Sequence, residues 1–245
     1  MTNDQRHGSR WQDRSRMTRP LEILVSALAV GAGFGAATSL VNALSHNNAD
    51  LESSAYTTSG WSIAEIMSLL LDSGWAWAGL AVAAGWLVTR ARESRPRTLA
   101  QGGAAAGALA LLAATAAYSI VDSIRSGEQI PWYMSEPAVW WVASVVLGAP
   151  LGAVGACVKR PGAIGLLARL TVPVGAAVQM VVLPPGRNEV VETAGKTIVW
   201  TVAAASIGYI VVRYLLVERR RRSLAVAESL PSTAGIARPR SSSAQ

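Results

Sequence analysis

The chain has 245 residues, of which 51% are hydrophobic and only 15% are charged, and its formal net charge is +7. A soluble domain usually carries about a quarter charged residues. Here the charges gather at the two ends and in short clusters. The uncharged runs between them are longer than the roughly 18 residues that mark a membrane span. The composition therefore excludes a large soluble domain and predicts an integral membrane protein.

The uncharged runs predict an all-α fold, a polytopic transmembrane helical bundle with six spans. Span boundaries follow the hydrophobic runs, and the transmembrane domain covers residues 21–217. Residues 1–20 and 218–245 are basic, polar and poor in aromatic side chains, so both are predicted to be disordered cytoplasmic tails. In chain order the spans are residues 21–44, 63–88, 99–122, 138–158, 163–183 and 197–217.

The basic residues predict the orientation of the spans. The sequence has 22 lysines and arginines. All but Arg125, Arg187 and Lys196 lie in the two tails, in the loops after the second and fourth spans, or in the halves of the spans nearest to these segments. An excess of basic residues on short segments marks the cytoplasmic side. We therefore predict a multi-pass protein of the plasma membrane with both termini in the cytoplasm. Topology accounts for the basic residues, so nucleic acid is not an expected partner.

Aromatic residues gather near the predicted outer boundary of the bundle, among them Trp140 and Trp141. Tryptophan and tyrosine are enriched at membrane interfaces because their rings are amphipathic. We interpret these residues as an interfacial belt, with a platform for a cofactor or carbohydrate as the alternative.

Three spans carry pairs of glycines four residues apart. Glycine at positions i and i+4 opens a flat stripe on one helix face, along which another helix backbone can approach closely. The pattern predicts tight helix packing but does not distinguish contacts inside the bundle from contacts with a second copy or another membrane protein. Apart from those contacts, the lipid bilayer is the only expected partner. The pairs are Gly31 and Gly35, Gly103 and Gly107, and Gly148 and Gly152.

The stretch LLLDSGWAWAGLAVAAGWLV places the carboxylate of Asp72 inside the second span. Counting along the helices puts Asp72 and Asp122 near the outer interface, where we predict an outer polar site with Tyr118 and Arg125. Asp72-Ser73-Gly74 is also a place for span 2 to bend. We favour a structural role for Asp72, either bonding N–H groups freed by that bend or pairing with Arg125. An ion or proton site is the alternative, since charged groups inside membranes are functional candidates.

Arg169 lies about two turns into the fifth span. Two roles are open for it: its long side chain reaches the inner surface, or it pairs with an acid such as Glu22 or Glu218.

No arrangement of residues typical of an enzyme occurs in the sequence. The only cysteine is Cys157, and both histidines, His7 and His46, lie outside the spans. The chain has no H-E-x-x-H, G-x-S-x-G, Walker A or C-x-x-C motif. We therefore predict no catalytic residue, no metal site and no cofactor.

Three segments, LDSGWAWAGLAVAAGWL, AAYSIVDSI and WWVASVVLGAPLGAVGA, resemble a six-span integral membrane family found mainly in actinobacteria. The resemblance covers about residues 21–217 and rests on the Asp-Ser-Gly-x-x-Trp entry to one span, the tyrosine near the end of the next, and the glycine-rich end of a Trp-led span. The family has no assigned activity, so the resemblance implies a membrane topology and no chemistry.

Two functions from different classes are compatible with these patterns. The leading hypothesis is a non-catalytic integral membrane protein that acts as a scaffold or assembly component. The alternative is a transporter or permease subunit that uses an outer acidic vestibule.

Overall fold

The computed structural model describes residues 24–45, 63–90, 96–127, 135–184 and 189–229. Every regular element in these ranges is an α-helix, so the predicted all-α class is confirmed for this part of the chain. The helices are a first helix, Leu24–Ser45, followed by α3 (Ile63–Asp72), α4 (Gly74–Thr89), α5 (Pro96–Ser126), α6 (Ser135–Cys157), α7 (Ala163–Val182) and α8 (Glu189–Ser229).

Five of these helices are individually long and apolar enough to cross a membrane: the first helix, α5, α6, α7 and α8. Helices α3 and α4 meet that criterion only together, and they are bent by 59° at the single residue between them. The predicted second span is therefore bent, and the bend lies at Ser73. By length and composition the described helices provide five candidate spans, or six when this bent pair is counted as one.

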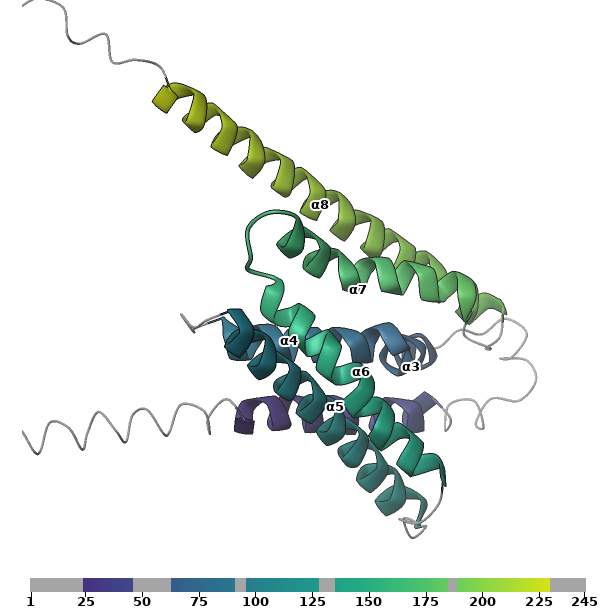
Figure 1. The fold of residues 1–245 in the computed structure, drawn as a ribbon. Coiled ribbons are helices and arrows are strands. Elements are labelled where there is room, and N and C mark those ends of the chain that lie inside the picture. Colours follow the sequence, from purple (N-terminus) through teal and green to yellow (C-terminus); the bar gives the residue numbers. More distant parts are fainter. Residues whose placement is uncertain (1–23, 46–62, 91–95, 128–134, 185–188, 230–245) are drawn as a thin grey trace, which may run out of the picture.

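The centre of the bundle is formed by α4, α5 and α6, which pack against one another more extensively than the other pairs among α3 to α8 do. The first helix crosses α5 on one side of this centre, and α7 and α8 pair on the other side, where α7 packs mainly against α4 (Figure 1). The central core is built largely from small side chains, including Ala81, Ala84, Ala110 and Ala114. Small side chains let helix backbones approach closely. In a bilayer there is no hydrophobic driving force between helices, so the van der Waals contacts of such close packing are a main contribution to helix association.

The glycine pair of the first helix lies against the backbone of α5. A Cβ atom placed on Gly31 would lie 2.9 Å from the Cα atom of Ala110, and one on Gly35 would lie 2.8 Å from that of Ala114. Any larger side chain at these positions would therefore separate the two helices.

The other two glycine pairs face each other between α5 and α6. A Cβ atom on Gly107 would lie 2.7 Å from the Cα atom of Gly152, and one on Gly148 would lie 2.9 Å from that of Ala108. A Cβ atom on Gly103 would likewise lie 2.6 Å from the carbonyl oxygen of Gly152. All six predicted packing glycines thus lie at contacts inside this chain.

Helix α8 is longer than the sequence predicted. It continues past residue 217 to Ser229, and the ion pair between Glu218 and Arg222 (3.5 Å) lies along it. The prediction that disorder begins at residue 218 is therefore wrong for residues 218–229. The predicted tail over residues 1–20 and the remainder of the second tail, residues 230–245, lie outside the described residues.

Candidate functional site

The break between α3 and α4 exposes the first backbone N–H groups of α4. Ser73 has an extended backbone (φ −69°, ψ 139°), and its hydroxyl donates to the carbonyl of Leu69 at 2.5 Å rather than to an N–H of α4. The N–H of Trp75 instead donates to Oε1 of Gln179 on α7, at 2.8 Å. Gly74 makes room for this amide, because a Cβ atom there would lie 3.2 Å from the same oxygen. Gln179 therefore provides the cap.

This arrangement corrects the capping role expected of Asp72. The predicted bend is confirmed, but the acceptor that satisfies a freed N–H group comes from Gln179. Asp72 is exposed and makes no hydrogen bond or ion pair within the described part of the chain.

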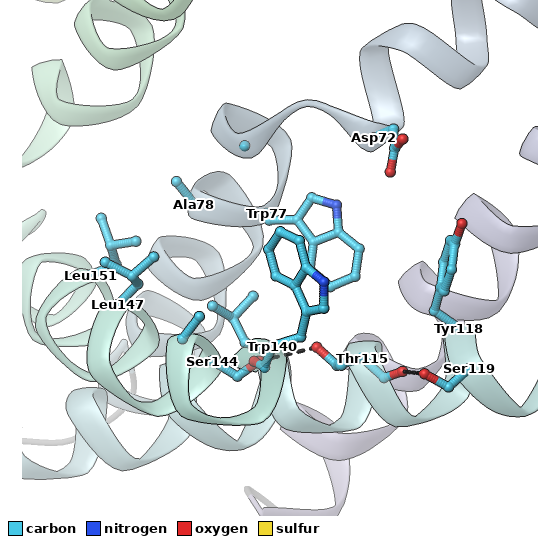
Figure 2. A pocket seen from close by; sticks show the side chains of 13 residues that line it. Asp72, Trp77, Ala78, Thr115, Tyr118, Ser119, Trp140, Ser144, Leu147 and Leu151 are labelled. Carbon is cyan, nitrogen blue, oxygen red and sulfur yellow. Dashed lines mark hydrogen bonds between the residues drawn. The ribbon is translucent and has the colours of Figure 1, made fainter. Parts of the chain in front are cut away.

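A cavity of about 640 Å³ lies beside the break, between α4, α5 and α6. We call it the Asp72 pocket. Figure 2 shows the indole rings of Trp77 and Trp140 in its centre, with Asp72 at the rim and Tyr118 on the α5 side. Leu111, Leu147 and Leu151 also line it. The pocket thus has apolar walls, two indoles and a phenol, with a carboxylate at its edge.

The position of Trp77 is held by a second aromatic ring. Phe34 of the first helix meets it edge to face, with ring centroids 5.5 Å apart and planes at 89°. Such a pair is worth about 0.5–1.5 kcal/mol beyond the area it buries. Trp140 is not held in this way and is 59% exposed, so it forms the open side of the pocket.

The hydroxyl groups that line the pocket have partners within the helices. Thr115 and Ser144 share a hydrogen bond of 3.0 Å between α5 and α6, and Ser144 also donates to the carbonyl of Trp140 at 2.8 Å. Ser119 donates to the carbonyl of Thr115 at 3.0 Å. The hydrogen bonds of these three hydroxyls therefore lie within and between α5 and α6, and none of them involves Asp72.

Tyr118 belongs to a hydrogen-bond chain that joins three helices. Its hydroxyl accepts from Nδ2 of Asn42 on the first helix at 3.2 Å, and Oδ1 of Asn42 accepts from the hydroxyl of Ser68 on α3 at 2.6 Å. Ser68 is fully buried and Asn42 nearly so. The sequence interpretation missed both residues, although an asparagine inside an apolar span was a signal that could have identified this contact.

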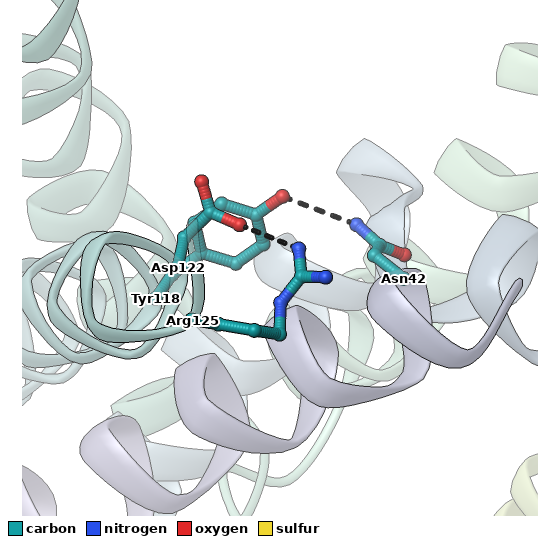
Figure 3. A network of polar contacts seen from close by, with 4 residues as sticks. All are labelled: Asn42, Tyr118, Asp122 and Arg125. Atoms are coloured by element: carbon teal, nitrogen blue, oxygen red, sulfur yellow. Dashed lines mark hydrogen bonds and ion pairs between the residues drawn. The ribbon is translucent and has the colours of Figure 1, made fainter. Parts of the chain in front are cut away.

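The other two residues of the predicted outer site do not line the pocket. Arg125 donates to Oδ1 of Asp122 at 3.1 Å, one turn along α5, and both side chains are well exposed (Figure 3). A surface pair of this kind contributes about 0–1 kcal/mol. Arg125 is therefore paired with Asp122 instead of Asp72. Of the four predicted residues, the structure brings only Asp72 and Tyr118 into one cavity.

Among the described residues that line the pocket, Asp72 is the only charged one. No group of three or more His, Cys, Asp or Glu side chains placed to hold a metal ion occurs in the described ranges. The chemistry that the pocket offers is therefore recognition of an apolar or aromatic body together with a cationic or hydrogen-bond-donating group.

Comparisons of the chain with protein-family models, with curated proteins and with solved structures give no match.

Proposed function

We propose that this chain is a non-catalytic, multi-pass plasma-membrane protein that binds a lipophilic cation in the Asp72 pocket, as a subunit of a transporter or permease would. In this proposal the bent α3–α4 pair counts as one of six spans, both termini are cytoplasmic, and the pocket opens towards the outer leaflet. The observation that carries it is a carboxylate at the rim of an apolar, aromatic cavity, with no partner in the part of the chain that the structure describes.

Three properties of the pocket support a cationic, apolar ligand. Its volume of about 640 Å³ falls within the ~300–1,000 Å³ usual for small-molecule sites. A cation over the face of Trp77, Trp140 or Tyr118 gains about 0.5–2 kcal/mol from the ring quadrupole. The carboxylate of Asp72 has no cation beside it among the described residues, so a ligand's positive charge would be its partner.

A scaffold or assembly role is the second candidate, and the exposure of α8 favours it. In the most apolar part of α8 only 11% of the residues are buried, compared with 28% in the first helix and in α5. This leaves most of the α8 surface free to contact another membrane protein. Co-purification of a stoichiometric partner that is lost on changing the α8 surface, without ligand binding, would favour this role.

Tetraphenylphosphonium, a lipophilic cation, is the probe for the proposed site. The purified full-length protein is expected to bind it in detergent, with a change in tryptophan fluorescence as rings of the pocket contact the ligand. Asp72→Asn keeps the shape of the side chain but removes its charge, and affinity should fall by about tenfold or more, the loss expected of a charged contact.

Asp122→Asn is the matched control, because Asp122 lies outside the pocket and is paired with Arg125. Its affinity for the probe should equal that of the unaltered protein. Neutral triphenylphosphine oxide should bind much more weakly than the cation. Equal affinity of Asp72→Asn and the unaltered protein would contradict the proposal.

Reporter fusions test the orientation separately. Because basic residues concentrate on one side of the bundle, reporters fused after Arg97 and after Lys159 should give cytoplasmic signals, and a reporter near Asp50 an external one. Activity of a periplasmic or extracellular reporter at Arg97 would overturn the topology that we propose.

A further inference from the structure

A second cavity, of about 310 Å³, lies at the opposite end of α4 from the Asp72 pocket. It is lined by residues from the end of α4, the turn between α6 and α7, and the sides of α7 and α8. Three of its lining residues are basic and come from three separate parts of the chain: Lys159, Arg169 and Arg213. We call it the basic cavity.

Each of the three cations is held in place by a neutral oxygen. Nε of Arg169 donates to the carbonyl of Val158 at 2.9 Å, and Nζ of Lys159 donates to the carbonyl of Arg90 at 2.9 Å. The guanidinium of Arg213 donates to the hydroxyl of Tyr209 at 3.2 Å. These bonds orient the side chains without neutralising their charge.

No carboxylate balances the basic cavity within the described residues. Of the acids expected to pair with Arg169, Glu218 bonds to Arg222 instead, and Glu22 lies outside the described residues. The other two ion pairs of the described chain, Asp122 with Arg125 and Glu192 with Lys196, also involve none of the three cations. Three positive charges therefore share one cavity without an anion among these residues.

The remaining donors suit a phosphate group. The bond from Nε of Arg169 to Val158 leaves the two terminal nitrogens of the guanidinium for a ligand, and such a planar fork matches two phosphate oxygens. Lysine contributes a compact third charge. Trp86 and Tyr209 also line the cavity, and such amphipathic rings favour the level of lipid headgroups.

We propose that the basic cavity binds a phosphate group, supplied by the headgroup of an anionic phospholipid in the cytoplasmic leaflet or by free inorganic phosphate. Basic pockets between membrane helices on the cytoplasmic side are a known form of lipid headgroup site. The inference uses the orientation proposed above but is independent of the Asp72 pocket and its ligand.

Native mass spectrometry of the full-length protein in detergent tests this site with two lipids, phosphatidylglycerol and phosphatidylcholine. The protein should retain phosphatidylglycerol at one saturable site and bind phosphatidylcholine at least about tenfold more weakly, because phosphatidylcholine has no net negative charge to meet the three cations. Arg213→Gln should weaken phosphatidylglycerol binding about tenfold, and Arg169→Gln with Arg213→Gln about a hundredfold.

Arg222→Gln is the matched control, because Arg222 lies on the same helix as Arg213 but outside the cavity, where it pairs with Glu218. Its lipid binding should be unchanged. Arg213 is exposed, so its replacement should leave the melting temperature unaltered even if the Arg169 variant does not fold.

Competition with inorganic phosphate distinguishes the two sources of the ligand. If millimolar phosphate does not displace phosphatidylglycerol, the ligand is the lipid. If it does displace the lipid, the ligand is free phosphate. Both outcomes support an anion site. Equal retention of phosphatidylglycerol by the Arg213→Gln variant and by the unaltered protein would overturn the proposal, as would equal binding of the two lipids.

Discussion

Gly152→Ala is expected to destabilise the folded protein by about 3 kcal/mol or more, at the upper end of the cost of overpacking a well-packed core. A Cβ atom on Gly152 would lie 2.9 Å from the Cα atom and from the backbone nitrogen of Gly107, and would also overlap the carbonyl oxygen of Gly103. These neighbours are backbone atoms, so no side chain can rotate to make room. Helices α5 and α6 would have to separate, which would weaken the most extensive contact among α3 to α8.

Gly175→Ala is the matched control for this prediction. Gly175 also lies inside a membrane-length helix, α7, but it is exposed and has nothing within 4 Å of the position of a Cβ atom. Alanine there should leave stability unchanged or raise it slightly, since alanine has the higher helix propensity. Thermal unfolding in detergent, followed by circular dichroism, measures both variants. Equal melting temperatures would mean that the glycine at position 152 is not needed for helix contact.

Gln179→Met is expected to lower stability by about 1 kcal/mol or more, because it leaves a partly buried donor without its acceptor. Methionine is similar in length to glutamine but offers no oxygen to the N–H of Trp75, which Gln179 now accepts at 2.8 Å. The effect should be largest in a lipid bilayer, where water cannot replace the lost acceptor. Melting temperatures of the reconstituted protein measure it.

Asp72→Asn and Asp72→Leu serve as controls at the same helix break. Because Asp72 is exposed and caps nothing, both variants should stay within about 0.5 kcal/mol of the unaltered protein, as is usual for surface substitutions. The contrast between positions 72 and 179 is the informative result. Loss of stability in Asp72→Leu with none in Gln179→Met would restore the capping role first expected of Asp72 and contradict the one assigned to Gln179.

The sequence by itself determined the helices and the residues at which they can approach closely. Hydrophobic length is a local property, so the runs predict the helices that are long enough to span a membrane, and glycines four residues apart open a stripe on any helix that contains them. The bend at Asp72-Ser73-Gly74 could be predicted from the sequence because it also depends on neighbouring residues of one segment. The end of α8 was not, because the arginines from Arg219 to Arg222 end the hydrophobic run without ending the helix.

The tertiary structure alone decided which groups meet. Gln179 lies 104 residues from the N–H that it accepts, and Asn42 lies 76 residues from Tyr118. The sequence offered Asp72 for the first contact because it is adjacent to the break. An acceptor must lie along the direction of the N–H, however, and the packing of α7 against α4 decides which side chain lies there. Arg125 shows the opposite case, since its partner Asp122 is one turn away. Contacts inside one helix follow from spacing, whereas contacts between helices depend on the packing of the whole bundle.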